Sequence, residues 1–163
     1  MDTERLVGEK VIADDLTFVS QVWGDDRVSP TIGGPVASDE IQHRLASWTS
    51  HWDTHGFGMT LFRERQTNTR IGWGGLQHST IGIGERLTVG YVIDPAAWGR
   101  GYASEIALSC VDYAFTMLSA DALYASVLST NAASCRVLAK AGFHQLCEVE
   151  HSGYIEVVFA AKR

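Results

Sequence analysis

One stretch near the middle of the chain, residues 89–105, restricts the possible folds more than any other. Its first five residues end a predicted strand, a long helix is expected from Tyr102, and Gly99 and Gly101 lie between the two. At such a junction the first helical turn leaves backbone N–H groups unpaired, and the helix dipole adds partial positive charge. Glycines keep side chains away from these groups, so a phosphate can reach them. The sequence therefore predicts an anion-binding loop.

Two common nucleotide-binding motifs do not fit this loop. A P-loop ends in Gly-Lys-Ser or Gly-Lys-Thr, and neither tripeptide is present. The dinucleotide fingerprint has a third glycine where Ser104 stands, and it follows the first strand of its domain. Arg100, between the two glycines, adds a mobile positive charge.

The hydrophobic pattern of the remaining chain predicts one mixed α/β domain over residues 1–163. The expected order is βααβββαβαββ. We expect strands at residues 4–12, 59–65, 70–78, 86–93, 123–128, 143–149 and 154–160. Helices are expected at residues 14–23, capped by Asp14 and Asp15, and at 38–55, 102–118 and 131–141, with a loop over 25–37.

Composition excludes several classes of protein. The net charge of −6 argues against nonspecific binding of nucleic acid, which requires a basic face. No apolar run reaches the roughly 18 residues of a membrane span, and the first residues lack a signal-peptide pattern, so we expect a cytoplasmic protein without membrane contact. Cys110, Cys135 and Cys147 have no metal-binding spacing. We expect them to be small buried core residues, and we expect no bound metal.

The glycine loop and a second segment carry a resemblance to a known family. Residues 98–105 (Trp-Gly-Arg-Gly-Tyr-Ala-Ser-Glu), followed by 112–115, resemble the acetyl-CoA pyrophosphate loop and helix of GNAT acetyltransferases. Residues 131–143 resemble the second signature of the Rim-type branch, the ribosomal-protein N-terminal acetyltransferases, and residues 3–6 and 32–35 also match it. The resemblance implies a GNAT domain with a mixed sheet of about six to seven strands, helices on both faces, and a splay beside the coenzyme loop.

The resemblance also implies acetyl-CoA as co-substrate and a set of residues that bind it. Backbone amides would hold the pyrophosphate at Trp98, Gly99, Arg100, Gly101, Tyr102 and Ala103. The pantetheine arm would lie in the splay, against the amides of Tyr91, Val92 and Ile93. Asn131 would hydrogen-bond the pantetheine, although an asparagine there also suits a helix N-cap.

Three positions depart from the family pattern. Ala96 stands where the loop usually opens with Gln or Arg. Thr88 occupies the place of a strand Glu found in many relatives, and Ala139 the place of a Tyr that acts as general acid. Neither usual proton-transfer residue is therefore present.

The implied reaction is direct attack of a neutral amine on the acetyl thioester. Ser134 is our candidate for hydrogen-bonding the thiolate, since it lies about one helical turn after Asn131. His78 and Glu85 are candidate bases, acting directly or through water, although each also suits an ordinary surface residue. An α-amine, with a pKa near 8, needs less help from a base than a lysine amine, whose pKa is about 10.4.

The acceptor is expected to be a protein N-terminus or a small-molecule amine. Trp23, Trp48, Trp52 and Phe57 are expected mostly in the core, with one or two lining the acceptor cleft. A homodimer is a further expectation, because GNAT relatives often pair. The alternative functions are a catalytically weak acyl-CoA sensor of the same fold, favoured by Thr88 and Ala139, and a nucleotide-binding loop.

Overall fold

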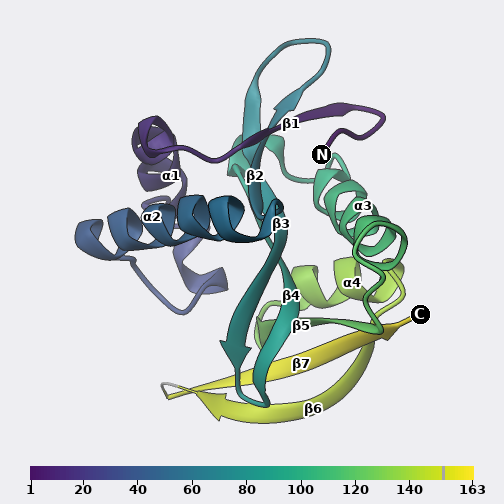
Figure 1. Ribbon diagram of the computed structural model, residues 1–163. Helices are drawn as coiled ribbons and strands as arrows, with labels where there is room; N and C mark the ends of the chain where they lie inside the picture. Colours follow the sequence, from purple (N-terminus) through teal and green to yellow (C-terminus); the bar gives the residue numbers. More distant parts are fainter. Residues whose placement is uncertain (152) are drawn as a thin grey trace.

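The computed structural model describes residues 1–151 and 153–163, which form one seven-stranded sheet with helices on both faces (Figure 1). The strand order is β1-β2-β3-β4-β5-β7-β6. The strands are β1 (Leu6–Lys10), β2 (Met59–Glu64), β3 (Arg70–Ile81), β4 (Gly84–Ile93), β5 (Ala122–Leu128), β6 (His144–His151) and β7 (Tyr154–Lys162). The helices are α1 (Leu16–Trp23), α2 (Ser38–His55), α3 (Tyr102–Thr116) and α4 (Ala132–Lys140). Short 3-10 turns lie at Ala13–Asp15, Ser29–Thr31 and Pro95–Ala97. The predicted order of elements and the fold class are confirmed.

The sheet splits where β4 and β5 run side by side. These two parallel strands pair at a single position, Thr88 with Tyr124. Beyond it β4 stays paired with β3 as far as Ile93, whereas β5 stays paired with β7 as far as Leu128. One edge of each strand therefore faces an opening, which is the splay expected from the sequence.

Two hydrophobic cores lie on the two faces of the sheet. The larger core joins α3 and α4 to the sheet through small residues such as Ala107, Cys110 and Ala114, which let α3 approach closely. The smaller core lies under α1 and α2 and is built around Trp23, Trp48 and Trp73, whose rings contact one another. Figure 1 shows α1 and α2 on one side of the sheet and α3 and α4 on the other.

Several predicted boundaries are corrected. The β3–β4 hairpin is longer than expected, because Ile81 still pairs with Gly84, whose positive φ of 95° closes a tight turn. Glu85 therefore belongs to β4 and not to a loop. Helix α3 ends at Thr116 instead of Leu118, and Ser119 follows with a positive φ of 51°.

The start of α1 also differs from the prediction. Asp15 does not cap the helix; its Oδ2 accepts a hydrogen bond from the Ile12 N–H at 3.0 Å, and its Oδ1 pairs with Arg70 at 3.1 Å. Of the three cysteines, Cys110 is buried as expected, whereas Cys135 and Cys147 are partly exposed. Over the described ranges, no helix combines the length and the apolar composition needed to cross a membrane.

Candidate functional site

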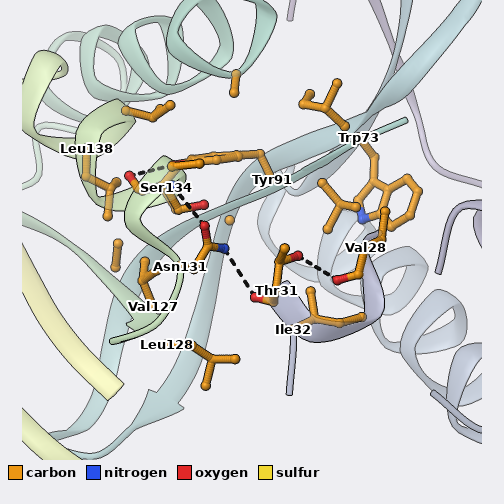
Figure 2. Close-up of a pocket in the computed structure, with 18 of the residues that line it drawn as sticks. Val28, Thr31, Ile32, Trp73, Tyr91, Val127, Leu128, Asn131, Ser134 and Leu138 are labelled. Carbon is orange, nitrogen blue, oxygen red and sulfur yellow. Dashed lines mark hydrogen bonds between the residues drawn. The ribbon is translucent and has the colours of Figure 1, made fainter. Parts of the chain in front are cut away.

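A cleft of about 1160 Å³ occupies the opening between β4 and β5 and extends toward α1 and α2 (Figure 2). Its walls come from the α1–α2 segment, β3, β4, the start of α3, β5, α4 and β7. The predicted site residues that line it are His78, Tyr91, Val92, Ile93, Trp98, Gly99, Gly101, Tyr102, Ala103, Asn131 and Ser134. Arg100 and Glu85, both exposed, are not among its lining residues. Most of the predicted site is therefore brought together in one place.

The glycine loop presents unpaired donors to one end of the cleft. Gly99 and Gly101 have φ values of +76° and +81°, which glycine adopts without strain. In the described chain the N–H groups of residues 99–104 donate to no protein acceptor, and the first helical bond runs from Glu105 N–H to Gly101 O at 3.1 Å. The Trp98 N–H already donates to Pro95 O at 3.3 Å. The loop geometry therefore suits an anion held by the amides that follow Trp98.

An arginine from the N-terminal segment holds this loop in place. Arg5 Nη1 donates to Arg100 O at 2.9 Å, and Arg5 Nε donates to Glu105 Oε2 at 2.7 Å. The guanidinium also lies 4.6 Å from the centre of the Tyr102 ring. Sequence reasoning gave Arg5 no role, because no local pattern connects residues a hundred positions apart.

Two carboxylates next to the loop serve its structure. Glu105 accepts hydrogen bonds from Thr3 Oγ1 at 2.5 Å and from the Arg5 N–H at 2.8 Å. Burial alone would raise the pKa of Glu105, but these hydrogen bonds outweigh it and hold the pKa below its usual value. Glu64 accepts the hydroxyl hydrogen bond of Tyr102, which lowers the pKa of Glu64 and raises that of Tyr102. The Tyr102 side chain is thus fixed beside Glu64.

The start of α4 forms the opposite wall of the cleft (Figure 2). Asn131 Oδ1 accepts from the Ser134 N–H at 3.0 Å, so its interpretation as an N-cap is confirmed. Its Nδ2 also donates to Thr31 O at 3.2 Å, which ties the α1–α2 segment to α4. The Tyr91 hydroxyl donates to Ser134 O at 3.4 Å, and burial raises the pKa of this phenol. Tyr91 therefore stays protonated at neutral pH.

The two predicted bases lie in different surroundings. The His78 ring lies against His55, His51 and Phe57, at centroid distances of 5.0, 5.8 and 5.8 Å. Alternation along β3 puts this ring on the face opposite to Gln77 and Ser79. Glu85 is exposed, and on β4 it lies opposite Thr80 of β3 near the end of the hairpin.

A carboxylate that the sequence analysis did not single out lines the cleft. Glu156 is half-buried on β7, and its Oε2 accepts a hydrogen bond from Ser126 Oγ at 2.5 Å. No motif surrounds it in the sequence, because it reaches the cleft through the pairing of β5 with β7.

His51 gives the fold a predicted pH dependence. Its Nδ1–H donates to Phe57 O, and its Nε2 accepts the His78 N–H, both at 2.9 Å, so the ring is neutral. Burial lowers the pKa of His51 in the folded state, and the unfolded chain therefore takes up its proton first as pH falls below about 6.5. We expect stability to decrease by about 1 kcal/mol below that pH, because protonation of Nε2 breaks the bond to His78.

Thermal unfolding followed at a series of pH values checks this expectation. His51→Asn should be less stable than the wild type at neutral pH and should vary less with pH. The exposed His43 on the same helix supplies the control, since His43→Asn should keep the wild-type pH dependence. Equal pH dependence of all three proteins would refute the role given to His51.

Comparisons with known proteins agree with this geometry. A family model described as an acetyltransferase (GNAT) domain matches residues 5–144. The uncharacterized protein YkkB of Bacillus subtilis is 32% identical over 134 residues, which are 80% of this chain and 76% of YkkB. An acetyltransferase structure from Agrobacterium tumefaciens has a TM-score of 0.88 at 23% identity and covers 100% of this chain and 94% of its own. The ribosomal-protein-S5-alanine acetyltransferase of Vibrio fischeri has a TM-score of 0.78 at 15% identity, with coverage of 99% and 95%.

Proposed function

Because the chain belongs to the acetyltransferase (GNAT) family, we propose that it transfers the acetyl group of acetyl-CoA to a primary amine by direct nucleophilic attack. The acceptor that we favour is the α-amine of a protein N-terminus, and a small-molecule amine is the alternative. One observation carries the proposal: the open edge of β4 and the unpaired N–H groups that follow Trp98 meet in a single cleft.

The residues of the cleft fit acetyl-CoA, which supplies an activated acetyl group when it is bound. The amides of residues 99–103 suit its pyrophosphate, and a Cβ added at Gly99 would meet no protein atom within 4 Å, so the space above the loop is open. The edge of β4 at Tyr91, Val92 and Ile93 offers backbone groups for an extended pantetheine arm. Arg136 and Lys140 add positive charge along α4.

Side chains and amides near the converging strands would then act on the reacting groups. The main-chain N–H near Val92 or Ile93 would stabilise negative charge on the carbonyl oxygen. The Ser134 hydroxyl lines the cleft and would hydrogen-bond the departing sulfur. Asn131 would hold the pantetheine with whichever of its polar atoms is released from its present partners.

The pKa of the amine supports an α-amine as acceptor. With a pKa near 8, about a tenth of an α-amine is already neutral at pH 7, so it requires little help from a base.

A pair of matched glycine variants tests the coenzyme site. Gly99 and Gly142 both have positive φ, of 76° and 87°, and neither has an atom within 4 Å of an added Cβ. An alanine should therefore strain both backbones by a similar amount, about 1–2 kcal/mol. We expect Gly99→Ala to weaken CoA binding about tenfold or more in calorimetry, because its Cβ would crowd the phosphates. Gly142→Ala should bind CoA like the wild type, and equal losses in both variants would contradict the proposed site.

An amine panel tests the reaction itself. Release of free thiol from acetyl-CoA is measured with peptides that begin in Ala, Ser or Met, with spermidine and with lysine. The proposal expects turnover, fastest with a peptide. CoA binding without turnover on any amine would instead support the acyl-CoA sensor, and protection from thermal unfolding by ATP but not by CoA would support a nucleotide site.

A further inference from the structure

We propose that Glu156 is the catalytic base that receives the proton of the acceptor amine, replacing the carboxylate that is missing at Thr88. This inference rests on the proposed function, since it assigns a residue to the amine side of the same cleft. Thr88 is buried at the point where β4 and β5 converge, and its hydroxyl contacts Ser79 Oγ at 2.8 Å. Thr88 cannot take up a proton from an amine.

Strand pairing places Glu156 on the same face of the sheet as Thr88. Thr88 pairs with Tyr124, and Ser126 lies two residues further along β5, so these three side chains share a face. Glu156 pairs with Leu128 and shares this face too, which explains how its carboxylate reaches the Ser126 hydroxyl. The intervening Ala125 packs into the core with α3 and α4, so the shared face is the one on the side of α1 and α2.

The cleft itself singles out Glu156. Among the lining residues that the structure describes, Glu156 is the one carboxylate. The other lining groups that can carry charge are His78, Arg27, Arg44, Arg136, Lys140, Tyr91 and Tyr102. The His78 ring packs against His51 and His55 at the C-terminal end of α2, and Tyr91 remains a protonated phenol.

The loop that follows α1 packs against β7 close to Glu156. Tyr154, two residues before Glu156 and on the same face, lies against the loop that carries Gly33 and Gly34; a Cβ on Gly33 would be 3.7 Å from the Tyr154 ring. Thr31 and Ile32 of the same loop line the cleft together with Glu156.

Proton transfer to Glu156 comes before the formation of the new bond. The acceptor ammonium gives one proton to the Glu156 carboxylate, and the lone pair so released forms a bond to the acetyl carbon. The carbon–sulfur bond breaks and its electron pair stays on sulfur. The second proton of the attacking nitrogen moves to that thiolate, which gives the amide and the free thiol. Glu156 then returns its proton to solvent.

Glu156→Gln tests this role, because the amide keeps the shape of the side chain and its contact with Ser126. For an α-amine, of which about a tenth is already neutral at pH 7, we expect kcat/KM to fall about tenfold at that pH. The deficit should shrink as the pH approaches the pKa of the amine, which then loses its proton to water. Glu148→Gln, on the exposed part of β6, should retain wild-type activity.

Binding measurements separate a catalytic from a structural role. The thermal midpoint and the CoA dissociation constant of Glu156→Gln should equal those of the wild type. Binding of the same acceptor to the complex with CoA, which cannot react, should weaken about tenfold, because a charge-assisted hydrogen bond is lost. Unchanged kcat/KM at every pH, or a loss that follows lower stability and weaker CoA binding, would overturn the role of Glu156 and leave the proposed function intact. Failure of the wild type to acetylate any amine would overturn both.

Discussion

Replacement of Trp73 by alanine is expected to lower the free energy of unfolding by about 3–5 kcal/mol, the usual cost of deleting a large buried aromatic side chain. Trp73 is fully buried at the centre of the aromatic core under α1 and α2. Its ring centroid lies 5.2 Å from that of Trp23 and 6.2 Å from that of Trp48. Deleting the ring removes the surface on which both helices pack and enlarges the cleft that Trp73 lines. Urea unfolding followed by circular dichroism measures the loss.

Trp98→Ala is the matched control for this prediction. Trp98 is 43% exposed, and its indole N–H donates to Ile93 O at 2.7 Å. The expected loss of stability is about 1 kcal/mol, the net contribution of one hydrogen bond. Similar losses in the two variants would show that the packing of Trp73 does not dominate this half of the protein.

Most of the fold could be predicted from the sequence, because local residue patterns indicate where its helices and strands begin and end. Apolar periodicity predicted α2 through Ile41, Leu45, Trp48 and Trp52. The first three are buried as that spacing requires, whereas Trp52 is only partly buried. Gly56 ends this helix in a left-handed conformation, with a φ of 73°. The hairpin boundaries were less accessible, because the turn between Ile81 and Gly84 contains no proline or asparagine to mark it.

The walls of the cleft formed by the glycine loop and the start of α4 were also predictable, whereas the walls formed by β3 and β7 were not. The glycine loop and the start of α4 are continuous segments, so their residues signal their position by spacing alone. The face of the sheet on which His78 lies, and the face on which Glu156 lies, each depend on how strands far apart in the sequence pair. Alternation within one strand does not reveal which of its two faces points toward α1 and α2. For the same reason, the sequence did not show which of the four aromatic residues line the cleft. Trp23 and Trp48 do so, whereas Trp52 and Phe57 line a separate small hollow near Met1.

Glu105→Ala is expected to lower stability and to weaken coenzyme binding, because the contact of Arg5 with Glu105 holds the proposed coenzyme loop. Glu105 holds the Thr3 hydroxyl and both the main chain and the side chain of Arg5, while Arg5 holds the carbonyl of Arg100 in the glycine loop. We expect a loss of about 2–3 kcal/mol in the free energy of unfolding, since charge-assisted hydrogen bonds at a partly buried carboxylate are lost together. CoA should also bind more weakly, because the loop is no longer fixed.

The pH dependence of stability distinguishes this contact from simple packing. The pKa of Glu105 is lowered on folding, so its contribution is complete above the unfolded pKa of about 4.3 and disappears as the pH falls through the lower folded value. The difference in stability between wild type and Glu105→Ala should therefore be large at pH 7 and should narrow below pH 4. Glu9→Ala, which removes an exposed pair with Arg63 at 3.3 Å, should cost less than about 1 kcal/mol at either pH. A difference for Glu105→Ala that stays constant down to low pH would mean that the methylene groups, and not the charge, stabilise this end of the protein.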